Sequence, residues 1–517
     1  MKILTTEKVV LLIMLVVCLV VGVVNADPNM TKGPYLIYNG NNTEMVVLWQ
    51  LDANLPCKLE WGTTTSYGND VNTAEISSDH RHRHTITGLN TATKYYYKVW
   101  ESTDYTGPNH PGSFRTAPAP DAKNVKFLAY GDTRTYPDDH NTVCAGMVTT
   151  YTDDPDFQTM LLHCGDWVGW DSNYPPDQWG MFFSRSHSGI MELQANLPIQ
   201  GCRGNHEFLP YGCPPVNYKK FYPYPYPDDP LPSCPPDDDG GYYWSFDYGP
   251  AHIAVVDQYC NDGNYAPGTD QYEWLVDDLN DSEAPWKFLL FHEPGWSAKP
   301  ANTADVQNYI QPLCEYYGVD MVLNGHHHIY SHCDVNGIKH IVTGGGGAEL
   351  HWVNLSRENV VAGKAAYHFC EIDIQGDVLY FTAREPDGLI IDKFALGMPD
   401  SPKFRINDTS GDPVAWFDGS GNLVLKGTLD ANTTPEANNT IDEFRFQDPN
   451  GNDLAIIDAN SGNMYITGLL YENQDTLQLD GDNHFIIKGS NDTVVAYIDD
   501  PNGSLYLKGK LYENSNP

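Results

Sequence analysis

The chain has 517 residues, which exceeds the size of a single hydrophobic core and predicts about three domains. Apolar residues make up 41% of it, as in soluble globular proteins, and the formal net charge at pH 7 is −38. A surface this acidic repels nucleic acid and anionic membranes, so we expect neither as a partner. It also disfavours a phosphate-bearing substrate, unless bound cations reverse the local field.

Residues 1–26 have the pattern of a signal peptide. Lys2 and Lys8 precede an apolar run at residues 9–24, and Val24-Asn25-Ala26 provides small residues for cleavage. The apolar run is short for a membrane span, although an uncleaved anchor is the alternative. We therefore expect a secreted or cell-surface protein with no stable membrane span after cleavage. Export permits disulfides, and we expect Cys213 and Cys234 to close the Pro- and Tyr-rich loop between them.

Residues 30–117 contain short apolar or alternating segments, among them "EMVVLWQ", "HTITGL" and "KYYYKVW", separated by turn residues. This pattern predicts an antiparallel β-sandwich. The segments "LNTATKYYYKV" and "SFRTAP" resemble a fibronectin type III module, with Tyr95 or Tyr97 as its corner tyrosine. We expect His82 and His84 to lie on a solvated strand edge.

Residues 121–397 have a different character. Buried-looking strands such as "VKFLAYGD", "TMLLHCGD", "WKFLLFHEP" and "VDMVLNGHHH" are separated by segments long enough for helices. The pattern predicts an α/β domain. Each of these strands ends in a polar cluster, and ligands of α/β sheets collect beyond the carboxyl ends of strands.

Residues 398–517 contain three similar segments: "DPVAWFDGSGNLVLKG", "NDLAIIDANSGNMYITG" and "DTVVAYIDDPNGSLYLKG". Their closing glycines, Gly427, Gly468 and Gly509, are 41 residues apart. We expect an all-β repeat module whose units bury a shared face against their neighbours. The sequence does not decide whether the repeats close into a barrel, stack as a solenoid or pair with other chains.

The polar clusters of the α/β region contain oxygen and imidazole side chains. Such side chains, converging from separate strands, predict a site for hard or borderline divalent metals. In an extended segment alternate side chains face the same way, so in "GHHHIY" His326 and His328 should share this site while His327 points elsewhere. The clusters supply Asp132, Asp166, Asn205, His206, His292, His326 and His328.

The order and spacing of these motifs closely resemble the calcineurin-like metallophosphoesterases. The motifs are Gly-Asp, a second Gly-Asp, Gly-Asn-His-Glu, a lone His after an apolar strand, and Gly-His-x-His, followed by "VTGGGGAE". Within that family the chain most resembles purple acid phosphatases, in which a fibronectin-like domain also precedes the catalytic one. The resemblance covers about residues 30–397 and implies a central four-layer α/β domain.

The resemblance also implies two metals roughly 3–4 Å apart, with a bridging hydroxide that attacks phosphorus in line. Zinc, manganese or iron would suit the site. His206 would be the general acid or charge stabiliser beside the scissile phosphate. The metal ligands would be Asp166 as the bridge, Asp132 and His328 on the first metal, and Asn205, His292 and His326 on the second.

The chain departs from the purple acid phosphatase pattern at two positions. The tyrosine ligand three residues after the second aspartate is replaced by Gly169, so no tyrosinate-to-iron colour is expected unless another tyrosine such as Tyr136 substitutes. Other metallophosphoesterases have the motif Asp-x-His here, and the position of its histidine is taken by Arg134. Arginine cannot ligate a metal but can bind phosphate through two hydrogen bonds. An ion pair with a nearby carboxylate is the alternative role for Arg134.

Three further features have two interpretations each. Glu207 either orients His206 or forms a structural ion pair. Trp296 either covers the core, which we favour, or walls the substrate cleft. The tyrosines at residues 222–226 are either a substrate lid or part of a surface loop without a role.

The sequence therefore predicts an exported phosphatase that hydrolyses phosphate esters, most readily monoesters, by a two-metal mechanism. Phosphodiester and nucleotide substrates remain open. The alternative is a surface-structural or binding protein that retains a phosphoesterase scaffold. In either case residues 398–517 are the expected site of self-assembly or cell-surface attachment.

Overall fold

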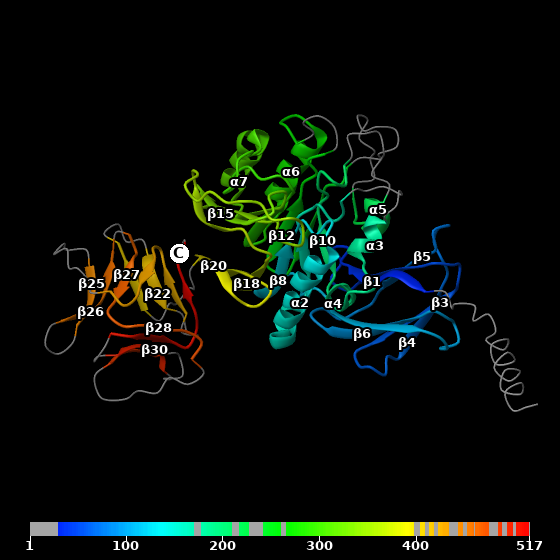
Figure 1. Ribbon diagram of the computed structural model, residues 1–517, viewed down its shortest axis with the longest axis horizontal. Coiled ribbons are helices and arrows are strands. Elements are labelled where there is room, and N and C mark those ends of the chain that lie inside the picture. The colour runs from blue at the N-terminus through cyan, green and yellow to red at the C-terminus, as the bar shows by residue number, and fades with distance from the viewer. Residues whose placement is uncertain are drawn as a thin grey trace, which may run out of the picture.

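In the computed structural model the chain is mostly β structure and forms three parts, which follow one another along the sequence (Figure 1). The expected signal peptide and the pair Cys213 and Cys234 lie outside the described residues. Among the described residues no helix is both long and apolar enough to cross a membrane. The described residues are 29–169, 177–208, 217–226, 241–259, 265–397, 404–408, 413–417, 422–433, 443–447, 452–459, 461–474, 484–488, 494–499 and 503–515.

The first part consists of two antiparallel sheets that enclose one core. The sheets have the strand orders β1-β2-β5 and β4-β3-β6-β7. Buried residues of both sheets, such as Trp49 and Tyr97, belong to one cluster. The hydroxyl of Tyr95 accepts a hydrogen bond from the backbone N–H of Asn90 at 3.0 Å, as a corner tyrosine does. The strands are β1 (Met30–Ile37), β2 (Met45–Leu51), β3 (Cys57–Gly62), β4 (Asn69–Thr73), β5 (Arg81–Ile86), β6 (Lys94–Trp100) and β7 (Asn109–Arg115).

The expectation of a solvated pair of histidines is wrong for His82. Although β5 is an edge strand, His82 is 1% exposed and its ring stacks on Trp49 with centroids 5.1 Å apart. Its neighbour on the same face, His84, is half-buried beside Trp61. The sheet face on which both lie packs against the other sheet rather than water, and Thr73 Oγ1 of that sheet lies 3.3 Å from His82 Nδ1.

The central part has two sheets packed face to face and helices on their outer faces. A six-stranded sheet has the order β10-β9-β8-β18-β19-β20, and a seven-stranded sheet has the order β11-β12-β13-β14-β16-β15-β17. Phe127 of the first and Phe288 of the second meet edge to face at 5.6 Å. The strands are β8 (Asn124–Tyr130), β9 (Leu161–His163), β10 (Ile199–Gly201), β11 (Trp244–Tyr248), β12 (Ala251–Val255), β13 (Trp286–Leu290), β14 (Met321–Asn324), β15 (Tyr330–Val335), β16 (Ile338–Thr343), β17 (Val360–Lys364), β18 (Phe369–Gln375), β19 (Val378–Arg384) and β20 (Ile390–Gly397).

The helices complete a four-layer α/β arrangement (Figure 1). Leu275 of α6 and Leu313 of α7 pack against Leu289 and Val322 of the seven-stranded sheet. Helices α2 and α4 lie on the other side and contribute Val143 and Leu193 to the main core. The helical segments are α2 (Pro137–Asp153), the short η1 (Pro155–Phe157), α3 (Gln178–Phe182), α4 (Ser188–Asn196), α5 (Tyr218–Phe221), α6 (Asp270–Asp281), η2 (Val306–Ile310) and α7 (Gln311–Tyr317).

Residues 222–226 are neither a lid nor a surface loop. Tyr222, Tyr224 and Tyr226 are buried in the main core. The Tyr224 ring stacks on Trp244 at 4.4 Å, and its hydroxyl donates to the carbonyl oxygen of Ile199 at 2.9 Å. The alternating tyrosines face inward between prolines, and backbone carbonyls accept from the hydroxyls of Tyr224 and Tyr226, so a polar-looking segment is compatible with burial.

The C-terminal repeats close into a ring of three four-stranded sheets. The sheet orders are β21-β22-β23-β32, β24-β27-β26-β25 and β28-β31-β30-β29. Each repeat thus supplies three strands of one sheet and a two-residue edge strand of another, and β32 of the last repeat returns to the first. The strands are β21 (Phe404–Asn407), β22 (Pro413–Phe417), β23 (Leu423–Leu425), β24 (Leu429–Asp430), β25 (Glu443–Gln447), β26 (Asp453–Asp458), β27 (Met464–Ile466), β28 (Leu470–Tyr471), β29 (His484–Lys488), β30 (Val494–Asp499), β31 (Leu505–Leu507) and β32 (Leu511–Tyr512).

Equivalent side chains close the three junctions of the ring. The backbone N–H after each closing glycine donates to a side-chain oxygen of another repeat, and these contacts run around the ring in one sense. A Cβ atom on Gly427 would lie 2.0 Å from Asn463 Oδ1, which accounts for glycine at this point of the period. The junction bonds are Thr428 N to Asn463 Oδ1 (2.9 Å), Leu469 N to Ser504 Oγ (3.1 Å) and Lys510 N to Asn422 Oδ1 (2.8 Å).

The ring is docked on the edge of the six-stranded sheet. Trp416 and Tyr512 of the ring form one buried cluster with Val378 and Tyr380 of β19. The Tyr380 and Tyr512 rings lie 4.6 Å apart. The backbone N–H of Ala395 in β20 donates to Ser515 Oγ at 2.8 Å, so hydrogen bonds support the apolar contact.

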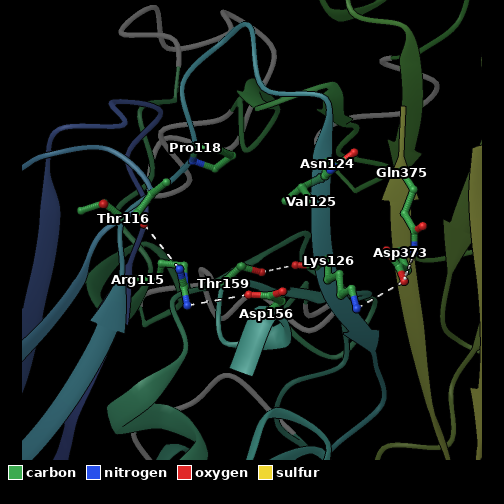
Figure 2. Close-up of a pocket in the computed structure, with 11 residues that line it drawn as sticks. Arg115, Thr116, Pro118, Asn124, Val125, Lys126, Asp156, Thr159, Asp373 and Gln375 are labelled. Atoms are coloured by element: carbon green, nitrogen blue, oxygen red, sulfur yellow. Dashed lines mark hydrogen bonds and ion pairs between the residues drawn. The ribbon is translucent and has the colours of Figure 1, made fainter. Parts of the chain in front are cut away.

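A cavity of about 450 Å³ lies between the first part and the central sheets (Figure 2). It is lined by Arg115 and by Asn124, Val125 and Lys126 at the amino end of β8. Lys126 is paired there with Asp373 at 3.4 Å. The polar clusters of the sequence follow the carboxyl ends of strands, roughly 20 Å further along β8 at about 3.3 Å per residue, so this cavity is separate from the predicted site.

Candidate metal centre

The predicted metal ligands meet at the carboxyl ends of strands from both central sheets. Asp132 follows β8 and Asp166 follows β9 in the six-stranded sheet, whereas His292 follows β13 in the seven-stranded sheet. Because these strands run parallel within each sheet, their following loops gather at one edge. One ligand atom from each of the three side chains lies within 4.8 Å of the others.

The remaining predicted ligands adjoin this trio in two groups. On one side, the amide oxygen of Asn205 lies 3.1 Å from His326 Nδ1 and 3.2 Å from His292 Nε2. On the other side, His328 Nε2 lies 3.5 Å from a carboxylate oxygen of Asp132. Asp166 lies between the groups, with one oxygen 3.2 Å from His292 Nε2. The structure therefore brings all six side chains together.

The triple histidine divides as predicted, although it forms a bend with a positive φ at His326 rather than an extended segment. His326 and His328 face the cluster, whereas Nδ1 of the buried His327 lies 2.9 Å from the hydroxyl of Ser297. The backbone N–H of His326 also donates to both carboxylate oxygens of Asp132, each at 3.0 Å. The tripeptide thus holds one loop of the seven-stranded sheet against the first loop of the six-stranded sheet.

The backbone around the cluster is tightly constrained. Asp132, Asp166 and His326 have positive φ angles of 59°, 54° and 66°, which side chains other than glycine seldom adopt. A Cβ atom on Gly325 would lie 2.4 Å from an oxygen of Asp132, so glycine is required before the histidines. Strained residues of this kind concentrate at functional sites, where the surrounding structure holds them.

Backbone carbonyls orient two of the imidazoles. His292 Nδ1 lies 2.7 Å from the carbonyl oxygen of Cys164, and His328 Nδ1 lies 2.6 Å from that of Glu349. Each Nδ1 therefore carries a proton and donates it, which leaves Nε2 directed at the carboxylates. Metal-ligating histidines are oriented by such bonds.

Glu207 supports the backbone of two site loops. Its buried carboxylate accepts hydrogen bonds from the N–H groups of Asp166 at 3.0 Å, Val168 at 3.1 Å and Gly204 at 2.7 Å. Neither interpretation from the sequence describes this role, because the carboxylate pairs with backbone donors rather than with His206 or a cation. Glu207 fixes the loop of Asp166 to the loop of Asn205.

The electrostatics of the cluster fit a bound cation. Burial raises the pKa of Asp132 well above its ordinary value. Burial alone would lower the pKa of His292, but Asp166 and Asp132 raise it to about 10. Two fully buried carboxylates thus compete for the positive charge available, and a divalent metal supplies that charge. The amide oxygen and the free imidazole nitrogens complete a donor set suited to zinc, manganese or iron.

Arg134 lies beside Asp166 and His328. Its Nε is 3.3 Å from Asp166 Oδ2, and its Nη2 is 3.4 Å from His328 Nε2. The Nε is buried without a well-aligned hydrogen bond. The ion pair with Asp166 is therefore present, and it leaves donors of the guanidinium for a further anion.

The position of the tyrosine ligand in the resembling family has no phenol here. A Cβ atom on Gly169 would lie 2.7 Å from Gln178 Oε1, and the Gly169 carbonyl accepts from His206 Nδ1 at 2.5 Å. Tyr136 is 43% exposed at the start of α2, and among the described residues no hydrogen bond joins its phenol to the ligands.

Two residues that sequence reasoning missed lie beside His328. His351 stacks on the His328 ring with centroids 4.1 Å apart, and Lys299 Nζ lies 2.9 Å from His351 Nδ1. Both follow recognisable motifs, "FHEPGWSAK" and "GGGGAELH", but no spacing rule separates them from other loop residues. Of the other candidates, Trp296 is half-buried and meets His340 edge to face at 4.8 Å.

Residues 148–330 match the sequence model of the calcineurin-like phosphoesterases. The chain carries a calcineurin-like phosphoesterase domain. The match includes Asp166, Asn205, His292, His326 and His328, whereas Asp132 and Arg134 precede it.

Among curated proteins, the chain is similar to purple acid phosphatase 1 of Ipomoea batatas, with 28% identity over 318 residues, which are 57% of this chain and 59% of the relative. It is 27% identical to Fe(3+)-Zn(2+) purple acid phosphatase 12 of Arabidopsis thaliana over 280 residues, 49% of this chain and 52% of the relative. The chain thus spans just over half the length of these relatives. Among solved structures, the purple acid phosphatase PPD1 of Lupinus luteus shares the fold, with a TM-score of 0.54 and 20% sequence identity. The alignment covers 70% of this chain and 74% of the PPD1 chain.

Proposed function

We propose that the chain is an exported, metal-dependent phosphoesterase that hydrolyses phosphate monoesters at a dinuclear centre. The observation that supports this most strongly is the convergence of Asp132, Asp166 and His292, all buried, within 4.8 Å of one another. Two fully buried carboxylates are costly unless cations compensate them, and Arg134 beside Asp166 supplies a single positive charge. The similarity to purple acid phosphatases supports the reaction class.

The groups of ligands divide between two metals. Asp132 and His328 would hold the first, Asn205, His292 and His326 the second, and Asp166 both. When bound, the metals supply Lewis-acid activation of the phosphate and a nucleophile that is available at neutral pH. The similar Arabidopsis protein is named for an iron–zinc pair, and the oxygen- and nitrogen-rich donor set of this chain suits iron, zinc or manganese.

His206 is the candidate proton donor to the leaving group. Its Nδ1 donates to the carbonyl oxygen of Gly169, which fixes the ring and directs Nε2 toward Asp166 Oδ2, 3.7 Å away. A substrate phosphate held beside Asp166 would therefore meet Nε2. A proton on that nitrogen can pass to the departing alkoxide or stabilise the charge that develops on it.

Arg134 is the candidate clamp for the phosphate. Its guanidinium borders both Asp166 and His328, and its planar fork of donors matches two oxygens of a phosphate. Because Arg remains charged at every accessible pH, it holds a phosphate dianion in the otherwise acidic chain. His206 and Arg134 together would orient the ester between the ligands of the two metals.

Metal content and hydrolysis of p-nitrophenyl phosphate test this proposal. We expect about two metals per chain in the wild type. His326→Ala should lose metal and activity by at least about 10- to 100-fold, the loss seen when even an outer partner of a metal ligand is removed. His327→Ala is the matched control, because the adjacent imidazole contacts Ser297 instead, and it should retain both.

The alternative, a binding protein on a phosphoesterase scaffold, predicts a different outcome. It predicts one metal or none and no turnover after reconstitution with zinc, manganese or iron. Export is tested separately by the intact mass of the secreted protein, which should begin at Asp27. We further propose that the ring of residues 404–515 is the attachment or assembly module, and a chain ending near Ser401 that keeps the same surface location and assembly state would contradict this.

A further inference from the structure

The cavity between the β-sandwich and the central sheets lies at the amino end of β8 (Figure 2). Its volume of about 450 Å³ falls in the range of roughly 300–1,000 Å³ that is typical of small-molecule pockets, which often lie at domain interfaces. Residues of both parts line it, Arg115 and Thr116 from the end of β7 and Asp373 and Gln375 from the end of β18. A molecule in this cavity would therefore contact two domains at once.

Arg115 presents an incompletely bonded guanidinium on the sandwich side of the cavity. Its Nη1 donates to the carbonyl oxygen of Ala92 over a long 3.4 Å, and its Nε is buried without a hydrogen-bond partner among the described residues. Its one ion pair in the described part of the chain joins Nη2 to the exposed Asp156 across 3.9 Å. Most of the five N–H donors of this arginine are thus left for another acceptor.

Asp373 presents the opposite chemistry on the side of the central sheets. Its Oδ2 accepts from Gln375 Nε2 at 2.9 Å and lies 3.4 Å from Lys126 Nζ, whereas its Oδ1 is buried with no hydrogen-bond donor from any described residue. Lys126 is bonded more closely to Asp154, at 2.7 Å, so two carboxylates share one ammonium. Burial raises the pKa of Asp373, while Lys126 lowers it, as for a carboxylate whose charge is only partly compensated.

The two unsatisfied groups lie on opposite walls of the same cavity. Figure 2 shows Arg115 on one side and Asp373, with Lys126, on the other. One wall thus offers unused donors with a positive charge, and the other an unused acceptor with a negative charge. Buried polar groups are nearly always paired, and a missing partner costs free energy. A ligand that carries both an acceptor and a donor of opposite charge would pair both walls, whereas an ion of one sign would leave one wall unpaired.

We propose that this cavity binds a small zwitterion, in which a carboxylate and an ammonium group are joined by a short chain, as in an amino acid. The carboxylate would accept hydrogen bonds from the planar fork of Arg115, and the ammonium would donate to Oδ1 of Asp373. The site is independent of the proposed phosphoesterase reaction, because the cavity lies at the opposite end of β8 from Asp132. The bound zwitterion would bridge the β-sandwich and the central sheets and stabilise the folded protein.

Calorimetric titration of the full-length protein with a series of zwitterions tests this site. Glycine, β-alanine and γ-aminobutyrate carry the same two charges at increasing separation, so at least one of them should bind. Butyrate and butylamine each carry one of the two charges and can satisfy only one wall. They should bind more weakly than the best zwitterion by about 10-fold or more, the loss for one charge-assisted hydrogen bond.

Variants of the two walls locate the site. Arg115→Met and Asp373→Asn should each lower the affinity for the best zwitterion by about 10-fold or more, since each removes one charged partner. The matched controls are Lys123→Met and Asp377→Asn, which remove exposed charges of the same signs close to the cavity but outside its lining. Both controls should keep the wild-type affinity.

Three results would overturn the proposal. If no member of the series binds, water alone fills the cavity. If butyrate or butylamine binds as tightly as the zwitterions, the two walls do not act together. If the control variants lose as much affinity as Arg115→Met and Asp373→Asn, the binding site lies elsewhere. Should a wall variant fail to fold, the comparison of zwitterions with butyrate and butylamine in the wild type still decides.

Discussion

The buried ion pair of Arg203 and Asp257 should be the electrostatic anchor of the loop that carries Asn205 and His206. Arg203 Nε and Nη2 donate to the two carboxylate oxygens of Asp257, each at 2.8 Å, and both side chains are fully buried. The guanidinium also lies over the Tyr242 ring, 4.1 Å from its centroid. Only Gly204 separates Arg203 from Asn205, so the pair fixes the start of the loop.

The expected cost of breaking this pair follows from its burial. In Arg203→Met the carboxylate of Asp257 keeps its charge in a dry environment, and removal of one partner from a buried pair costs about 3–5 kcal/mol. In an Asp257→Asn background no buried charge is left unpaired, so the same substitution should cost markedly less. Arg115→Met is the surface control, because Arg115 and Asp156 are 3.9 Å apart and partly exposed, and it should cost less than about 1 kcal/mol.

Urea unfolding followed by tryptophan fluorescence measures the effect, since Trp167 and Trp179 are buried near this part of the core. The midpoint should fall strongly in Arg203→Met, and less when the substitution is added to Asp257→Asn. Additive effects in the double variant, or a loss in Arg203→Met no larger than in Arg115→Met, would refute the reasoning. Either result would mean that the ion pair is not shielded from water.

Three further expectations concern a pH effect, the ring and the phosphate clamp. Burial alone would lower the pKa of His252, but two aspartates bonded to it raise the pKa from its ordinary 6.5 to about 9. The folded state therefore gains about 2–3 kcal/mol from the charged imidazole below pH 6.5 and loses this stabilisation as the pH rises through 9. Urea midpoints should fall over this pH range in the wild type and change less in His252→Gln. Asn463→Ala removes the acceptor of the Thr428 backbone N–H, so hydrogen exchange should show about 1 kcal/mol less protection at this amide. The amide of Leu469, at another junction of the ring, should keep its protection. Arg134→Ala should raise KM for p-nitrophenyl phosphate by about 10-fold or more, and unchanged KM and kcat would exclude the phosphate role.

The candidate metal site could be predicted from the sequence because its geometry follows from general rules. Polar residues after apolar strands in an α/β domain must gather at one edge, and side chains in an extended segment alternate. These two rules select His326 and His328 over His327. The structure shows the same division, but it arises in a bend with a φ of 66° at His326 rather than in an extended segment. The α/β class of the central domain and its resemblance to the calcineurin-like phosphoesterases were accessible in the same way.

The remaining features depend on contacts between segments that are distant in the sequence. His82 is buried because Trp49 of the neighbouring strand stacks on it, and no local pattern contains that information. Glu207 was expected to pair with a side chain, yet it binds three backbone N–H groups whose convergence exists only after two loops fold together. The repeats were recognisable from their period, but their closure into a ring depends on the pairing of β32 with β23, at the two ends of the module.

Gly169 stands at the position where the resembling family has a tyrosine ligand. Gly169 leaves this centre without a phenolate, so the iron-loaded wild type should show no tyrosinate-to-iron absorption band. The atom nearest to a new Cβ at this position is Oε1 of Gln178, at 2.7 Å, which is the far end of a flexible side chain that can move aside. We therefore expect Gly169→Tyr to tolerate the added ring and to gain a visible absorption band with ferric iron, whereas Gly169→Phe, of the same shape but without the hydroxyl, should stay colourless. A coloured wild type would show that another tyrosine binds the metal, and a colourless Gly169→Tyr with normal iron content would show that the loop carrying Gly169 directs this side chain away from the centre.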